Sequence, residues 1–199
     1  MKYDPTKHHR RSIRLKGYDY TQPGAYFVTI CTYQRQALLG EIVDGVMILN
    51  EFGEIVRQAW DDLPNHYPHV VLDEFCIMPN HIHGIIILTE TSLVRGGSET
   101  HPCDDAHPYD DAHPYDDAHS IKKRHGLPEI IRALKSFSSR RINQTLDSPG
   151  APVWQRNYYE HIVRNEGALN AIRRYIQNNP LKWELDQDNP INLRTRKGS

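Results

Sequence analysis

Two apolar segments separated by a two-residue turn constrain the fold of this chain more than any other feature of its sequence. The segments are Val70–Met78 and His81–Leu88, both rich in branched apolar side chains, and Pro79 and Asn80 lie between them. A connection this short joins strands that run antiparallel and pair with each other. The sequence therefore predicts a β-hairpin within a larger sheet.

Other elements are predicted around this hairpin from hydrophobic periodicity, capping residues and proline. In chain order they are a buried strand at Ala25–Tyr33, a short hairpin through Val46–Leu49, a helix capped by Asn50 and ended by Pro64, a helix at Leu127–Thr145, a strand-like segment within Val153–Val163, and a helix at Glu166–Asn179. Strands and helices in this order are typical of the α+β class. We expect an antiparallel sheet with helices packed on one face.

A six-residue repeat interrupts this pattern after the hairpin. Residues 101–119 read HPCDDA, HPYDDA, HPYDDA and a final His. Proline in every unit and the near absence of aliphatic side chains exclude a packed core, so we expect a solvated loop. The alternating His and Asp could hold a metal, although an inert expansion is the simpler interpretation. We predict one domain over residues 1–185, with an acidic insertion at 99–120 and a C-terminal tail at 186–199.

The formal net charge of −1 averages over regions of opposite sign. Residues 99–119 hold seven acidic side chains and no Lys or Arg, so the remainder of the chain carries +6. The basic excess concentrates in residues 1–16 and 122–141. Two basic blocks beside a folded domain suit a polyanionic partner such as nucleic acid, and an ordinary solvated surface is the alternative.

The sequence also bears on where such a protein works. Its apolar runs are far shorter than a bilayer-spanning helix requires, and its first residues are basic and polar rather than apolar. The three cysteines are widely spaced and form neither a CxxC pair nor a disulfide framework. We therefore expect a cytoplasmic protein with no membrane partner.

The sharpest local pattern is a pair of histidines, His81 and His83, at the start of the second hairpin strand. Side chains alternate along a strand, so the two imidazoles share one face about 6 to 7 Å apart, and they could bind one ion. An exposed or hydrogen-bonded pair is the alternative. Two ligands do not complete a metal site, so a further ligand must come from another element.

The last predicted helix offers such an element. Ala168, Ile172, Tyr175 and Asn179 are spaced by four, three and four residues, which places them along one helix face. The amide oxygen of Asn179 suits Mg²⁺ or Mn²⁺. A phenol with an ordinary pKa of about 10 is a weak nucleophile, but it becomes competent against a phosphate whose charge a metal neutralises. A tyrosine that only packs on its helix is the alternative.

Three segments carry a resemblance to a known family. They are MPNHIHGIIIL at 78–88, ALKSFSSRRIN at 133–143, and WQRNYYEHIVRNE at 154–166 followed by IRRYIQNNPLKW at 172–183. Together they resemble the REP-associated tyrosine transposases, a branch of the HUH single-tyrosine (IS200-like) transposases. The resemblance implies a ferredoxin-like (RRM-like) HUH catalytic domain. It also implies that His81 and His83 bind the metal with Asn179, and that Tyr175 is the nucleophile.

The function implied by the resemblance is a metal-dependent DNA transesterase of a bacterial nucleoid. Such an enzyme cleaves and rejoins single-stranded DNA beside palindromic hairpins through a 5′-phosphotyrosine, as a monomer or a homodimer. The candidate backbone contacts are Arg132, Lys135, Arg140, Arg141 and Arg156.

Several alternatives remain at this stage. Tyr158 and Tyr159, near His161, are rival nucleophiles. A domesticated relative that binds DNA hairpins without catalysis is the second function considered. The third is a hydrolase in which the histidine pair activates water.

Overall fold

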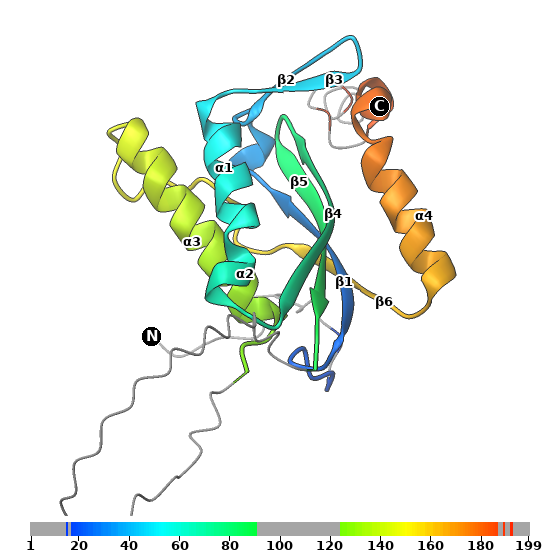
Figure 1. Cartoon of the computed structure of the whole chain (residues 1–199). Coiled ribbons are helices and arrows are strands. Elements are labelled where there is room, and N and C mark those ends of the chain that lie inside the picture. The colour runs from blue at the N-terminus through cyan, green and yellow to red at the C-terminus, as the bar shows by residue number, and fades with distance from the viewer. Residues whose placement is uncertain (1–14, 16, 91–123, 187–188, 190–191, 193–199) are drawn as a thin grey trace, which may run out of the picture.

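The computed structural model describes residues 15, 17–90, 124–186, 189 and 192 (Figure 1). The strands are β1 (Gly24–Cys31), β2 (Gly40–Val43), β3 (Val46–Leu49), β4 (Val70–Met78), β5 (His81–Leu88) and β6 (Tyr159–Val163). The helices are α1 (Glu51–Asp61), α2 (Leu63–His66), α3 (Leu127–Thr145) and α4 (Glu166–Gln177), with the 3-10 segments η1 (Tyr33–Arg35) and η2 (Pro180–Leu185). The insertion expected at 99–120 lies outside the described residues, as does most of the tail expected at 186–199.

Four strands form one antiparallel sheet in the order β4-β5-β1-β6. The chain passes from β1 through α1 to β4, and from β5 through α3 to β6, so each helix connects strands that are not neighbours. This is the ferredoxin-like arrangement. The predicted α+β class and topology are therefore confirmed, and β2 and β3 form a separate hairpin before α1.

The larger core lies between the sheet and the helices α1 and α3. Alternate residues of β5, Ile82, Ile86 and Leu88, point into it, and Trp60 of α1 covers the same face. The ring of Trp60 stacks on Phe75 with centroids 4.3 Å apart. This packing explains the glycine that follows the histidine pair, because a Cβ at Gly84 would lie 2.6 Å from Cζ2 of Trp60.

The helix α4 lies on the opposite face of the sheet, as Figure 1 shows. It packs against β4, and its Ile176 forms a second, smaller core with Phe27 and Ile85. The expectation that the helices pack on one face is therefore wrong for α4. The reason lies in β5, which is apolar on both sides, so the face carrying Ile85 also needs a cover.

Other predicted elements differ only at their ends. Pro64 does not end the helical region, since it occupies the first turn of the short α2, where a missing N–H is tolerated. Asn50 caps α1 as predicted, because its side-chain oxygen accepts from the N–H groups of Phe52 and Gly53 at 3.0 Å each. Within the described residues, no helix combines the length and the apolar character that crossing a membrane requires.

Candidate functional site

The histidine pair lies at the start of β5, on the sheet face that α4 covers. In the register of the sheet, His81 is opposite Cys31 and His83 is opposite Thr29 on β1. His81 is fully buried, His83 is 3% exposed, and their Nε2 atoms are 3.0 Å apart. Two ligand atoms about 2.1 Å from one ion and at right angles to each other are also about 3 Å apart. The pair therefore has the spacing of two ligands to a common ion.

Hydrogen bonds on the far side of each ring orient both imidazoles. Nδ1 of His81 lies 2.7 Å from Oδ1 of Asn80, and the amide nitrogen of Asn80 donates to the carbonyl of Arg35 at 3.2 Å. Because an amide oxygen only accepts, Nδ1 of His81 donates and its Nε2 keeps a lone pair. Nδ1 of His83 lies 2.8 Å from the hydroxyl of Thr29, which can donate to it or accept from it.

Burial also determines the charge of the pair. It lowers the pKa of His83 to about 4 and lowers that of His81 further, to about 2, with a smaller contribution from the neighbouring His83. Both rings are therefore neutral near pH 7. A neutral imidazole is the form that binds a metal ion.

Tyr175, on α4, brings its hydroxyl to the same place. The hydroxyl lies 3.3 Å from Nε2 of His83, and the two rings meet edge to face with centroids 5.2 Å apart. Burial raises the pKa of Tyr175, and a hydrogen bond from Asn179 acts in the opposite direction. The side chain is still 47% exposed, so a ligand can reach the phenol from solvent.

Asn179 supplies an oxygen that lacks a partner. Its side chain is buried, with 4% exposure, and Oδ1 makes no hydrogen bond among the described residues. It lies beside Tyr175, whose hydroxyl contacts His83. A buried acceptor without a partner is rare and costs free energy. The described residues contain no cluster of three His, Cys, Asp or Glu suited to a metal, so this orphan oxygen is the candidate third ligand.

The donor set fits the expected cofactor. Two neutral imidazole nitrogens and one amide oxygen are ligands that Mn²⁺ accepts, and Mg²⁺ also binds amide oxygens. No fourth protein ligand is needed, because water or a phosphate oxygen of a substrate completes the coordination of such ions. The chemistry of His81, His83 and Asn179 is therefore compatible with a labile divalent ion.

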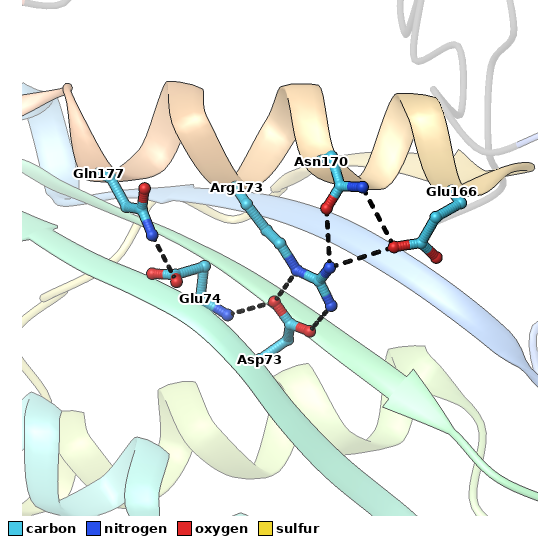
Figure 2. Close-up of polar contacts among 6 residues, drawn as sticks. All are labelled: Asp73, Glu74, Glu166, Asn170, Arg173 and Gln177. Atoms are coloured by element: carbon cyan, nitrogen blue, oxygen red, sulfur yellow. Dashed lines mark hydrogen bonds and ion pairs between the residues drawn. The ribbon is translucent and has the colours of Figure 1, made fainter.

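A polar tether attaches α4 to the edge strand β4 (Figure 2). Arg173 donates from Nε to Oδ1 of Asp73 at 2.9 Å and from Nη2 to Oδ2 at 2.6 Å, and Gln177 donates to Glu74 at 2.7 Å. The register of β4 shifts between Leu72 and Phe75, and this irregularity lets the consecutive Asp73 and Glu74 both reach α4.

The tether adds a polar attachment to an apolar one, in which Ile176, Leu169 and Ile172 of α4 pack in the second core. Ile176 is its single buried residue among those described, and it packs on Phe27 and Ile85. Arg173 lies two residues before Tyr175, so the bidentate pair with Asp73 fixes the helix close to the phenol. The sequence prediction missed this contact. The only indication was two acidic residues in an otherwise apolar strand.

The rival tyrosines lie further from the histidine pair. Thr29 on β1 is opposite both His83 on β5 and Tyr159 on β6, so Tyr159 shares their face but is two strands away, or about 10 Å. Tyr158 precedes β6 and lines both a hollow beside α3 and the hollow that contains His83 and Tyr175, but within the described part of the chain its hydroxyl makes no hydrogen bond to either imidazole. The described geometry therefore brings Tyr175, rather than Tyr158 or Tyr159, to the imidazoles.

The predicted DNA contacts divide into two groups. Arg132, Lys135 and Arg156 line one hollow of about 420 Å³ beside α3. Nζ of Lys135 already donates to the carbonyls of Gln155 and Arg156 at 2.6 and 3.0 Å, and burial lowers its pKa. Arg140 and Arg141 lie further along α3, where the guanidinium of Arg141 is 5.9 Å from the ring centre of Phe137. Their role in DNA binding remains a prediction.

Comparison with known proteins agrees with this arrangement. The family model described as "Transposase IS200 like" matches residues 118–179, which include α3, α4, Tyr175 and Asn179. An uncharacterised protein of Haemophilus influenzae is 41% identical over 189 residues, which are 94% of this chain and 96% of that protein. A second Haemophilus influenzae protein, named "Putative REP-associated tyrosine transposase", is 27% identical over 82% of this chain and 74% of its own length.

A solved structure supports the same assignment at the level of the fold. A REP-associated tyrosine transposase bound to a REP hairpin superposes with a TM-score of 0.52 at 18% identity, covering 85% of this chain and 74% of that one. The sequence match includes the helix that carries Tyr175, and the structural match extends over the sheet that carries the histidines. The chain therefore matches the IS200-like transposase family over residues 118–179, and a protein named as a putative REP-associated tyrosine transposase is among its relatives.

Proposed function

We propose that this chain is a metal-dependent transesterase that cleaves and rejoins single-stranded DNA beside hairpins. One observation carries the proposal: the hydroxyl of Tyr175 lies 3.3 Å from Nε2 of His83, which is itself 3.0 Å from Nε2 of His81. A nucleophile in contact with a candidate metal pair is the minimum that phosphoryl transfer requires. The orphan oxygen of Asn179 beside this phenol completes the set.

In the proposed reaction, Oη of Tyr175 attacks a backbone phosphorus. The bond from phosphorus to the tyrosine oxygen forms as the bond to the 3′ oxygen breaks, which leaves a 5′-phosphotyrosine and a free 3′-hydroxyl. The phenol proton passes to water in the open hollow, and the departing 3′ oxygen takes up a proton. When bound, a divalent ion neutralises charge on the phosphate. Attack by a 3′-hydroxyl on the phosphotyrosine reverses these steps and rejoins DNA.

The other residues around the site hold the reacting groups in place and take no part in bond making or breaking. Asn80 and Thr29 hold the imidazoles, and the Asp73–Arg173 pair holds the helix that carries Tyr175. His81, His83, Tyr175 and Asn179 come from one chain, so a monomer suffices for this site. The proposed DNA partner, a hairpin with a single-stranded flank, is supported by the relative that was solved with a REP hairpin.

The test is to trap the covalent intermediate. Purified protein is mixed with labelled single-stranded oligonucleotides that carry palindromic hairpins, with Mn²⁺ or with EDTA, and denaturing gels are examined for a protein–DNA adduct. We expect an adduct that requires the metal and is lost in Tyr175→Phe. Tyr159→Phe is the matched control and should still form it.

Other outcomes would support the competing functions. Tight hairpin binding without any adduct would favour a non-catalytic DNA-binding protein. Metal-dependent cleavage that leaves no adduct would favour a hydrolase. An adduct that survives Tyr175→Phe but not Tyr159→Phe would move the nucleophile to β6.

A further inference from the structure

A hollow of about 420 Å³ opens beside the catalytic tyrosine on the side away from β4. Its lining includes Phe27, Thr29, His83 and Tyr175, and it continues over β1 toward Tyr159 on β6. The tether of Figure 2 holds α4 above β4, so the helix leaves this side of the sheet uncovered. The volume lies within the range of about 300 to 1,000 Å³ that small ligands occupy in proteins.

One wall of the hollow is aromatic. Tyr159 is 54% exposed, and its ring meets the ring of Phe27 edge to face, with centroids 6.3 Å apart and planes at 69°. Phe27 is 9% exposed and packs against Ile176 and Ile85, so the phenylalanine supports the tyrosine from below. An exposed, supported aromatic ring on an antiparallel sheet is a surface on which an unpaired base can stack.

The rest of the lining suits a nucleotide rather than a generic apolar ligand. Gln155 and Asn157 contribute amide groups, which can both donate to and accept from a base edge, and Arg35 contributes a cation. The lining residues include no Asp or Glu. The carboxylate of Asp186 interacts with Arg35, Cys31 and Tyr175 of the lining but is not itself part of it.

From these observations we propose that the hollow is a binding site for one unpaired nucleotide of the DNA strand, directly beside the phosphate that Tyr175 attacks, and that Tyr159 stacks on its base. The inference rests on the proposed function for the position of that phosphate. Tyr159 and His83 both lie opposite Thr29, so Tyr159 is two strand spacings, or about 10 Å, from His83.

The experiment uses a fluorescent base as the probe. Oligonucleotides with one hairpin and a single-stranded tail carry 2-aminopurine at one tail position each, and the emission of this base falls when it stacks. The protein is the full chain with Tyr175→Phe, which prevents turnover. We expect a fall in emission at one tail position adjacent to the cleavage site mapped with the unmodified protein, and little change elsewhere.

Substitutions at the wall connect this signal to Tyr159. Adding Tyr159→Ala should abolish the local fall in emission and weaken binding roughly tenfold, because one base stack is lost. Adding Tyr159→Phe should preserve both. Phe137→Ala is the matched control, since Phe137 is an exposed aromatic on α3 that lines a different hollow.

The outcomes separate this inference from the proposed function. If the unmodified protein forms its adduct while Tyr159→Ala changes neither affinity nor emission, the nucleotide site is wrong and the transesterase stands. A fall in emission that depends on Tyr159, in a protein that forms no adduct, would support the nucleotide site and overturn the transesterase. Equal signals at every tail position would mean non-specific binding and would also overturn the site.

Discussion

Replacing Asn179 by Ala should separate metal binding from stability. In the metal-free protein the orphan Oδ1 of Asn179 costs about 1 to 3 kcal/mol, and the substitution removes this cost. It also removes the hydrogen bond to Tyr175, worth about 0.5 to 1.5 kcal/mol, together with some packing. The opposing contributions nearly cancel, so the free energy of unfolding in EDTA should change by less than about 1 kcal/mol.

The same substitution should remove most of the stabilisation by metal. At a Mn²⁺ concentration 100 times the Kd, binding adds about 2.7 kcal/mol to the unmodified protein, which raises Tm by roughly 5 to 10 °C. If loss of Asn179 weakens binding about 100-fold, the same concentration equals the new Kd and adds only about 0.4 kcal/mol, or about 1 °C. Thermal unfolding in EDTA and along a Mn²⁺ titration measures both effects.

The matched control is another buried asparagine with an orphan oxygen. Oδ1 of Asn143 also lacks a partner among the described residues, but this side chain lies on α3 and donates to the carbonyl of Ala151 at 2.8 Å. By the same balance, Asn143→Ala should change Tm in EDTA only slightly, and it should keep the full Mn²⁺ shift. The reasoning would be refuted if Asn179→Ala kept that shift too, because Asn179 would then not be a ligand.

Three further predictions concern the tether, the histidines and the glycine of β5. Arg173→Gln removes the ion pair with Asp73, so it should lower the rate of adduct formation on the order of 10- to 100-fold at saturating DNA and speed amide exchange in α4. The control is Arg174→Gln at the exposed neighbouring position, which should change neither property. In EDTA the free energy of unfolding should fall as the pH drops from about 6.5 toward 4, by up to about 1.4 kcal/mol per pH unit for each buried imidazole. The reason is that the histidines bind protons in the unfolded state at a higher pH than they do in the folded state. Urea titrations at several pH values measure this slope, and His83→Gln should make it smaller. Gly84→Ala should cost about 1 to 3 kcal/mol and lower Tm by several degrees, because the new Cβ meets Trp60, and an unchanged melting curve would mean that the indole moves aside freely.

Local sequence predicted much of the fold because its determinants are local. The Pro79-Asn80 turn fixed the pairing of β4 with β5, and the alternation along β5 placed His81 and His83 on one face, as the structure shows. Helix periodicity gave α3 and α4, and the family resemblance pointed to the contact between α4 and the histidine pair. The structure now places the Tyr175 hydroxyl 3.3 Å from His83.

The parts that sequence did not predict depend on contacts across the chain. The choice of sheet face for α4 depends on Ile176 meeting Phe27 and Ile85, which are distant in sequence. The tether depends on a register irregularity in β4, and the sequence there contains no Gly or Pro that would indicate it. The positioning roles of Asn80 and Thr29 follow only from measured hydrogen bonds, because polar residues next to a histidine are too common to be informative.

Because the two cores lie on opposite faces of the sheet, alternate residues of β5 are under different constraints. Ile82, Gly84, Ile86 and Leu88 face the large core, whereas His81, His83, Ile85 and Ile87 face α4. Protein abundance in a cell should therefore respond most strongly to substitutions at the even positions, and adduct formation per molecule to those at positions 81 and 83. In a mutational scan of β5, the effects on protein abundance and on adduct formation should therefore alternate with a period of two residues. Neighbouring positions of one strand would then affect different properties: stability at one position and reaction at the next.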